Sequence, residues 1–254
     1  MTNNGVEYTP IAITRGKISV SGTLDKSQME VRSTINNPLA EIFRVYPPSQ
    51  VVNIVIYQGH LSDPDAQFLV AWSGRVVSAR RENHELILAC EPVSTSLKRV
   101  GLRRHYQYTC MHVLYGDQCR ASKVAATKAV IVQSVDAKGS TVVLAEGWET
   151  DARAPKYLNG LFEWINSAGD LETRTILRVT NNRELLLAGY ARDLSAGMSA
   201  NAVLGCNHGL YKNANGIGLT EETDCYYLHN NMRNFGGCAF IPTVNPVGLS
   251  NHFY

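Results

Sequence analysis

Hydrophobic and polar residues along most of this chain follow short alternating or β-branched runs, which are typical of β-strands. The apolar runs have the length of strands rather than helices, and turn-forming residues such as Ala137-Lys138-Gly139-Ser140 separate them. The pattern therefore predicts a mainly β protein. The expected strands are Ile18–Val20, Val52–Tyr57, Phe68–Trp72, Val76–Ser78, Glu85–Ala89, Val130–Val135, Thr141–Ala145, Thr175–Val179 and Glu184–Ala188.

Two segments are the best candidates for helices. The first is Leu39–Tyr46, which ends where two prolines follow. The second is Ser96–Gly116, in which apolar residues recur at near-helical spacing. Gly116 suits the left-handed residue that follows a helix C-terminus, so we expect the chain to fold back at this glycine.

The chain also contains a weak internal repeat. Arg75–Ala89 aligns without gaps with Arg174–Ala188, and the two segments share Arg, Asn, Glu, two Leu and Ala. Val132–Gly147 has the same strand–turn–strand form. Either these are amphipathic hairpins that resemble each other by chance, or the chain holds two related β-barrels, one before and one after a basic segment.

These patterns divide the chain into four parts. We expect an N-terminal β-domain over residues 1–94, a basic and partly helical linker over residues 95–127, and a second β-domain over residues 128–204. Residues 205–254 are rich in Asn, Gly and Tyr and show little strand pattern. Because such a segment cannot build much core alone, something has to pin it, and metal ligation would do so.

The charge is unevenly distributed along the chain. The 254 residues carry a net charge of +2, and they suffice for one large domain or two small ones. Residues 97–128 have one acidic side chain and a local charge of +6, which leaves −4 for the rest. This stretch is either a solvated face or a counter-charge to an anionic site or partner. Its basic residues are Lys98, Arg99, Arg103, Arg104, Arg120, Lys123 and Lys128.

No apolar run approaches the ~18 residues that span a bilayer, and the N-terminal residues lack the apolar core of a signal peptide. We therefore expect no membrane span and synthesis in the cytoplasm. Disulfides are rare in that compartment, and clustered thiols there more often bind metal or do chemistry.

The cysteines carry the functional argument, because the chain has no Gly-x-Gly-x-x-Gly, no P-loop and no obvious catalytic signature. Cys110 and Cys119 frame one segment, and Cys206 and Cys225 follow near the end of the chain. Four converging thiolates hold either tetrahedral zinc or an iron–sulfur cluster. The spacing matches neither the tight knuckles of zinc ribbons nor the compact runs of ferredoxins, so it leaves both metals open.

Other residues are weaker candidates for ligands. Cys90 ends an apolar strand, and we expect it to be a buried core residue. His112, His208 and His229 lie near the cysteines, although a single histidine more often serves as a hydrogen-bonding residue.

Three functional classes besides a structural one fit parts of the sequence. A Cys₄ zinc module could bind a partner, including nucleic acid, through the basic linker, but no recognisable nucleic-acid-binding motif accompanies it. A cysteine hydrolase would use Cys110 or Cys119 as its nucleophile, but it would leave the other thiols unexplained. A disulfide-rich secreted protein would need an export signal. We therefore expect the protein not to be an enzyme.

A longer pattern surrounds the cysteines. It consists of a Leu-Lys-Arg…Arg-Arg-His-Tyr segment, Cys110 and Cys119 with Tyr115-Gly116-Asp117 between them, Asn159-Gly160-Leu161-Phe162 with Trp164 and Gly169, Gly205-Cys206-Asn207, Cys225, Asn230-Asn231, and Asn234–Gly237 ahead of Pro242. In this order and spacing, the residues resemble the phage tail-hub family typified by the minor tail protein L of lambda-like siphophages and the hub protein of gene transfer agents.

The resemblance implies a metal site. In that family the four matching cysteines ligate a [4Fe–4S] cluster. The resemblance therefore assigns this role to Cys110, Cys119, Cys206 and Cys225. The gap between Cys206 and Cys225 is longer than in the family and contains the insertion Asn213–Gly218. Cys238 stands where relatives tend to have another residue, which makes it the reserve for Cys225 as fourth ligand.

The resemblance also implies a role in the virion. Such hubs belong to the tail tip or baseplate and join the tail tube to the tip complex. They are similar in fold to tail-tube proteins, so the resemblance implies that residues 1–94 and 128–204 are two tail-tube-like β-barrels. A homotrimer with two barrels per chain presents six similar units to a sixfold tube. The implied partners are the distal tail ring, the central tip or fibre protein and the tape measure protein. DNA passes through the channel without specific binding, and assembly takes place in the host cytoplasm.

Overall fold

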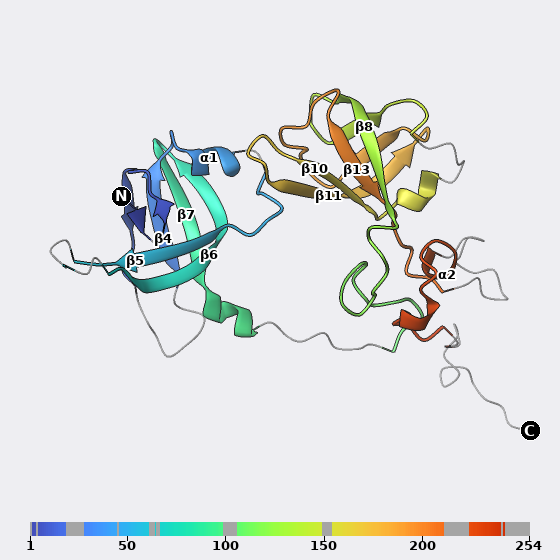
Figure 1. Cartoon of the computed structure of the whole chain (residues 1–254), viewed down its shortest axis with the longest axis horizontal. Helices are drawn as coiled ribbons and strands as arrows, with labels where there is room; N and C mark the ends of the chain where they lie inside the picture. Colours follow the sequence, from blue (N-terminus) through green and yellow to red (C-terminus); the bar gives the residue numbers. More distant parts are fainter. Residues whose placement is uncertain are drawn as a thin grey trace, which may run out of the picture. The chain divides into compact units, whose positions relative to one another are not determined.

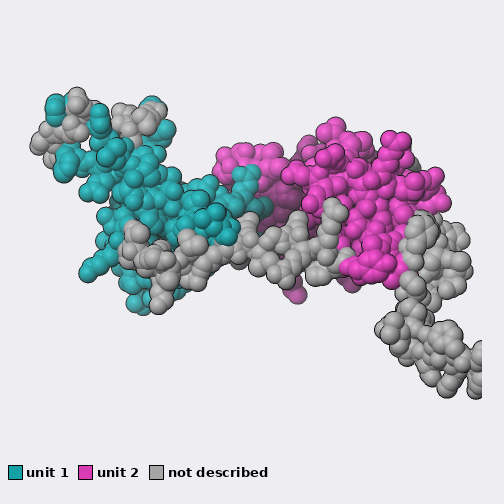
Figure 2. Space-filling model, turned by 90° about the horizontal axis from the view of Figure 1, so that it is seen from below, with its two compact units in different colours: residues 1–101 teal, residues 102–254 magenta. Residues whose placement is uncertain are grey.

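The structure is a computed structural model that describes residues 2–3, 5–18, 28–44, 46–60, 64, 67–98, 106–148, 154–210, 224–239 and 241. The chain divides into two compact units, residues 1–101 and 102–254 (Figure 2). The division falls inside the stretch that the sequence predicted as a separate linker. Most of the regular structure in both units is β, as the hydrophobic pattern predicted (Figure 1).

Unit 1 is built on a five-stranded antiparallel sheet in the order β3-β4-β7-β6-β5. A short pair of strands, β1 and β2, precedes it, the helix α1 follows β4, and the 3₁₀ helix η1 follows β7. The bounds are β1 (Thr2–Asn3), β2 (Val6–Glu7), β3 (Ile13–Arg15), β4 (Met29–Thr34), α1 (Pro38–Ile42), β5 (Asn53–Gln58), β6 (Leu69–Glu82), β7 (Glu85–Pro92) and η1 (Val93–Lys98).

Helix α1 begins where local chemistry favours a helix start. The Asn37 side chain accepts a hydrogen bond from the Ala40 N–H at 2.9 Å, and Pro38 occupies the first helical position. Ala40 is fully buried against the sheet. The sequence placed a helix over Leu39–Tyr46, and the structure confirms it in shorter form.

The concave face of the unit 1 sheet carries its core. Val31, Leu86, Leu88 and Cys90 are buried there, which confirms the expectation that Cys90 is a core residue. Burial raises the pKa of the Cys90 thiol to about 11, because the apolar surroundings disfavour the thiolate.

Unit 2 contains a closed antiparallel barrel of six strands in the order β10-β11-β12-β9-β8-β13. Its interior is filled by large apolar side chains, of which Phe162, Trp164 and Ile176 are almost fully buried. The bounds are β8 (Thr127–Val135), β9 (Thr141–Leu144), η2 (Ala154–Tyr157), β10 (Leu161–Ile165), β11 (Leu171–Thr180), β12 (Glu184–Leu187), β13 (Ser199–Val203), α2 (Asp224–Tyr227) and η3 (Met232–Asn234).

Five strands of the two units share one topology. In chain order, β3 to β7 of unit 1 correspond to β8 to β12 of unit 2, with the same antiparallel neighbours in each sheet. A short helix follows the second strand in both, α1 in one unit and η2 in the other. The two repeated sequence segments form the corresponding hairpins, β6–β7 and β11–β12.

Of the two predicted β-barrels, the structure shows a closed one in unit 2 and a curled half-barrel sheet in unit 1. In unit 2, β13 pairs with both β8 and β10 and closes the barrel. Among the described residues of unit 1, no strand takes the place of β13, and the segment after β7 forms η1 instead. A sheet closes into a barrel only when its two edge strands are bridged, so the described strands of unit 1 form an open, curled sheet.

The predicted helix over Ser96–Gly116 is also wrong for the residues that the structure describes. Only η1 is helical, and residues 106–126 form turns and irregular loop, whereas residues 99–105 lie outside the described part. The left-handed residue is Tyr115, with φ of 61°, rather than Gly116. The main chain here bonds instead to the distant C-terminal segment, which helical pairing would prevent.

Candidate metal centre

The four predicted thiols line one small cavity in unit 2. Cys110 and Cys119 come from the loop before β8, Cys206 follows β13, and Cys225 lies in α2. The remaining lining residues are His112, Leu114, His208, His229, Asn231 and Asn234. Among the residues that the structure describes, no three His, Cys, Asp or Glu side chains meet at the spacing of a single metal ion.

The barrel positions the start of the C-terminal ligand segment. The Gly205 N–H donates to the Lys156 carbonyl oxygen at 2.8 Å. A Cβ on Gly205 would lie 1.7 Å from the Leu158 carbonyl oxygen, so only glycine allows this approach of the two backbones. Cys206 is therefore held directly against the end of the barrel and is buried.

Cys110 and His208 join the two ligand segments by a reciprocal pair of hydrogen bonds. The Cys110 N–H donates to the His208 carbonyl oxygen at 2.8 Å, and the His208 Nδ1 lies 2.9 Å from the Cys110 carbonyl oxygen. His208 is itself left-handed, with φ of 57°, and its N–H donates to the Cys206 Sγ at 3.3 Å. One residue thus supports a cysteine from each segment.

Gly236 and Gly237, near the end of the described residues, pack closely on the loop that bears Cys110 and Cys119. The Gly236 N–H donates to the Cys110 Sγ at 3.2 Å. A Cβ on Gly236 would lie 2.5 Å from the His112 ring, and the His112 Nδ1 lies 2.9 Å from the Asn234 carbonyl oxygen. The contact explains why this position needs glycine, since any side chain would push the donor away from the sulfur.

Asn231 connects the two remaining cysteines. Its buried side-chain amide donates to the Cys119 carbonyl oxygen at 2.5 Å and contacts the Cys119 Sγ at 3.5 Å. Its own N–H donates to the Cys225 carbonyl oxygen at 2.8 Å, and the Cys225 thiol lies 3.5 Å from the Asn231 carbonyl oxygen. Asn234 donates to the Asn231 Oδ1 at 2.7 Å, which fixes the orientation of the amide.

Tyr115 connects the Cys110–Cys119 loop to the end of the barrel and to His229, which lines the cavity. Its hydroxyl donates to the Leu204 carbonyl oxygen at 2.6 Å, and its ring packs edge-on against His229 with 5.7 Å between ring centroids. Burial raises the pKa of the Tyr115 phenol, and negative charge on Cys206 and Cys119 raises it further. Tyr115 therefore stays a neutral hydrogen-bond donor beside the thiols.

The three histidines line the cavity, and each holds a distant segment of main chain through one ring nitrogen. His112 and His208 contact carbonyl oxygens across the two segments, and the His229 Nε2 lies 2.8 Å from the Gly205 carbonyl oxygen. These contacts show the histidines as supports for the cysteine loops.

The other two cysteines lie apart from this group. Cys238 is not among the residues that line the cavity, and its N–H donates to the Gln107 carbonyl oxygen at 2.8 Å. Cys90 belongs to the core of unit 1. None of the six cysteines is in a disulfide in this structure, so it offers no support for a disulfide framework. The insertion Asn213–Gly218 and Pro242 lie outside the described residues.

The basic residues that the structure describes do not line the cavity. Arg120 donates to the Asp117 carbonyl oxygen at 3.1 Å, Lys123 pairs with Glu163 at 2.7 Å, and Lys128 lies over the Trp148 ring. The side chains of Lys98, Arg99, Arg103 and Arg104 lie outside the described residues. For Arg120, Lys123 and Lys128, the idea of a counter-charge to the thiols finds no support.

This donor set suits a thiolate-bound metal centre. Main-chain N–H groups point at two of the sulfurs and a side-chain amide lies at a third, as described above. Such hydrogen bonds stabilise the anionic sulfur that ligates metal and tune the properties of iron–sulfur clusters. The residues present therefore fit a group held by four thiolates.

A solved structure has the same fold. Its title is "Virion of native gene transfer agent (GTA) particle", and one of its chains matches with a TM-score of 0.74. The match covers 100% of this chain and 86% of that chain at 17% sequence identity, so it establishes similarity of fold. No family model matches the sequence, and no curated protein does. Within the described residues, no helix is long and apolar enough to cross a membrane.

Proposed function

We propose that the protein is a structural component of a phage-like virion, and specifically the hub of the tail tip or baseplate. The observation that carries this proposal is the similarity in fold, over the whole chain, to a chain of a gene transfer agent virion. The specific place in the tail comes from the sequence resemblance to tail hubs. The convergence of the four matching cysteines on one cavity supports the same reading.

We propose further that Cys110, Cys119, Cys206 and Cys225 hold a [4Fe–4S] cluster. The sequence resemblance assigns a cluster to these four cysteines, and their position around one cavity supports a group that is held by four thiolates. When bound, such a cluster supplies folding free energy and has accessible redox states.

The role of the centre in this proposal is structural. The loop that bears Cys110 and Cys119 forms no helix or strand, and the segment around Cys225 has only the short helices α2 and η3. Neither segment has a large apolar core of its own. A centre that binds both segments would fix them to the end of the barrel, where hydrogen bonds to Gly205 and Leu204 already hold them.

The repeated topology supports a trimeric hub. Three copies of a chain with two related units present six related units, which is the number that a sixfold tail tube offers as partners. The neighbouring partners in this proposal are the distal tail ring, the central tip or fibre protein and the tape measure protein, with DNA passing through the channel. The trimer is tested by the mass of the purified protein in solution.

Metal analysis of protein purified without oxygen tests the centre. About four irons and four acid-labile sulfides per chain, with brown colour, are expected for a [4Fe–4S] cluster on four thiolates. Serine at Cys110, Cys119 or Cys206 should abolish metal binding, whereas Cys90→Ser should leave it intact because Cys90 lies in the core of unit 1.

The remaining substitutions separate the alternatives. Loss of metal in Cys225→Ser but not in Cys238→Ser would support Cys225 as the fourth ligand, and the reverse would assign Cys238. One zinc per chain in colourless protein would favour a Cys₄ zinc module over the cluster. Free thiols without any metal would contradict the proposed metal centre.

Electron microscopy of labelled particles tests the place in the virion. Antibodies against this chain should bind at the end of the tail that is distal to the head. Label on the head, or along the whole tail, would contradict the hub assignment. It would still agree with the broader proposal that the chain is a component of the virion.

A further inference from the structure

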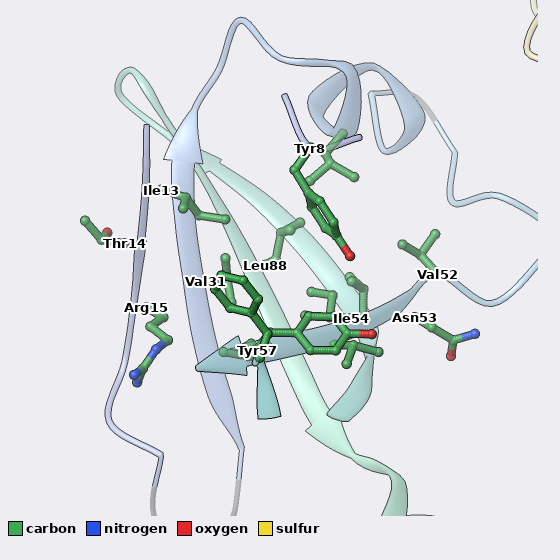
Figure 3. Close-up of a pocket in the computed structure, with 15 residues that line it drawn as sticks. Tyr8, Ile13, Thr14, Arg15, Val31, Val52, Asn53, Ile54, Tyr57 and Leu88 are labelled. Carbon is green, nitrogen blue, oxygen red and sulfur yellow. The ribbon is translucent and has the colours of Figure 1, made fainter. Parts of the chain in front are cut away.

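The open sheet of unit 1 has a groove along its concave face. The groove has a volume of about 680 Å³, and apolar side chains from every strand of the sheet contribute to it. Ile13 comes from one edge strand and Ile54 and Tyr57 come from the other, while Val31 and Leu88 form the floor (Figure 3). The groove therefore extends between the two edges that a closing strand would bridge.

Both edges of the sheet have unused main-chain groups in the part of the chain that is described. There, β3 pairs only with β4, and β5 pairs only with β6. Ile13 is 57% exposed, and Tyr57 is 37% exposed. An edge of this kind, beside exposed apolar side chains, is a template for an added strand.

Unit 2 shows what fills the corresponding place. There, β13 lies between the counterparts of β3 and β5 and runs antiparallel to both. Its Ala200 and Ala202 point into the barrel and are buried, whereas Ser199 and Asn201 are exposed. A short strand with apolar residues at alternate positions thus completes this topology.

We propose that unit 1 binds an extended segment of another protein chain, which takes the place of β13 and completes the barrel. Among the described residues, η1 stands where β13 would follow, and no strand of unit 1 fills that place. The inference rests on the topology of unit 1 and does not depend on the metal centre. In the proposed virion, the donor is a neighbouring tail protein.

The groove defines the chemistry of the segment. The barrel of unit 2 is filled by Trp164 and Phe162, which leave room only for alanine on β13. The groove of unit 1 is open, so the inward residues of the bound segment are larger, such as Ile, Leu or Val. Among the described residues that line the groove, only Arg15 is charged, so an acidic side chain of the segment lies beside β3.

Hydrogen exchange of the full-length protein tests the proposal with a defined probe. The probe is a peptide of residues 198–204 that carries A200I and A202I. We expect it to slow the exchange of residues 13–15 and 53–58 by at least ~10-fold, because a paired strand protects edge amides. The same peptide with N201P should give no protection, because proline has no N–H and breaks the strand.

A matched pair of protein variants localises the binding. Tyr57→Asp places a charge in the groove on a partly exposed side chain and should abolish the protection by the peptide. Val77→Asp lies at an exposed position of β6 that does not line the groove and should retain it. Metal content, measured in parallel, should be the same in both variants, so failure here is separable from failure of the metal centre.

Four results would overturn the inference. Absence of protection by the isoleucine peptide would exclude a strand site, and equal loss in Val77→Asp would place binding elsewhere. Slow exchange of residues 53–58 in the free chain at all concentrations would mean that the chain closes its own sheet. Protection that grows with protein concentration and without peptide would assign the site to a second copy.

Discussion

Asn231 illustrates how a single side chain can organise the cysteine cavity. It contacts Cys119 through its amide and Cys225 through its main chain, so it links ligands that are over a hundred residues apart in sequence. Supports of this kind typically contribute 10–100-fold in metal affinity. We expect Asn231→Ala to release metal about 10–100-fold faster to a chelator, as measured by absorbance.

The control for this prediction is Asn201→Ala. Asn201 is exposed on β13 and lies outside the cavity, so its loss should leave the rate of metal release unchanged. Equal rates in wild type and Asn231→Ala would mean that the amide does not support the ligands.

The buried Cys90 thiol makes the stability of unit 1 sensitive to alkali. Its pKa rises from the ordinary 9.0 to about 11 on folding, so the folded state favours the neutral thiol. The free energy of unfolding should therefore be unaffected below pH 9 and fall by up to ~2–3 kcal/mol as the pH passes through 11. Urea titrations at several pH values measure this.

Comparison with Cys90→Ala isolates the contribution of the thiol. The variant should lose some stability at every pH because it leaves a small cavity in the core. The difference between wild type and variant should shrink above pH 9. A constant difference from pH 8 to 11 would show that the thiol does not titrate in this range.

At the residue scale, the sequence predicted the cysteines but not their supports. Cys110, Cys119, Cys206 and Cys225 were identifiable from spacing and resemblance, and the structure brings them to one cavity. The role of Asn231 depends on contact between segments that no local pattern connects, although it lies in the quoted Asn230-Asn231 pair. Whether metal occupies the cavity stays a prediction.

At the element scale, β13 is the strand that distinguishes the two units. It closes the barrel of unit 2, and its inward Ala202 is fully buried among the large core side chains. Ala202→Leu should therefore overpack the barrel and lower the free energy of unfolding by about 1–3 kcal/mol. The neighbouring Asn201→Leu, on the exposed face, should change it by less than ~0.5 kcal/mol.

Tryptophan fluorescence measures this effect in the barrel alone. The chain has three tryptophans, and a Trp72→Phe background leaves only Trp148 and Trp164, both in the core of unit 2. Urea unfolding of both leucine variants in this background gives the comparison. Equal stability of Ala202→Leu and Asn201→Leu would contradict the packing of β13 described above.

Elements were predictable where local pattern decides them. The hairpins β6–β7 and β11–β12 follow from alternation and turn residues, and Asn37 and the prolines bracket α1. The predicted helix over Ser96–Gly116 is wrong for residues 106–116, because residues at near-helical spacing there contact the C-terminal segment and the cavity instead of forming one face of a helix. Cys110 points to the cavity, and its N–H bonds to His208. The sequence could not show whether the sheet of unit 1 closes into a barrel, because closure depends on a further strand that pairs with both edge strands.

At the scale of the whole molecule, the two units share one strand topology but differ in whether the sheet is closed. Unit 2 has a closed barrel, and all four cavity thiols lie in its residues. Unit 1 keeps the same five strands but leaves its concave face open. The repeated fold thus occurs as a closed copy in unit 2 and, in the described residues, as an open copy in unit 1, where we have proposed a binding surface.

Removal of the metal should therefore affect only one unit. The contacts described above that hold the cavity lie within residues 102–254, so chelation should speed the amide exchange of residues 106–119 and 225–238 by orders of magnitude. The strands β4, β6 and β7 of unit 1 should exchange at unchanged rates and serve as the internal control. Hydrogen exchange with mass spectrometry, before and after chelation, measures both units in the same sample. Uniform acceleration across the chain would mean that the metal stabilises the whole molecule, and unchanged exchange at Cys110 and Cys225 would mean that the metal does not hold the two segments together.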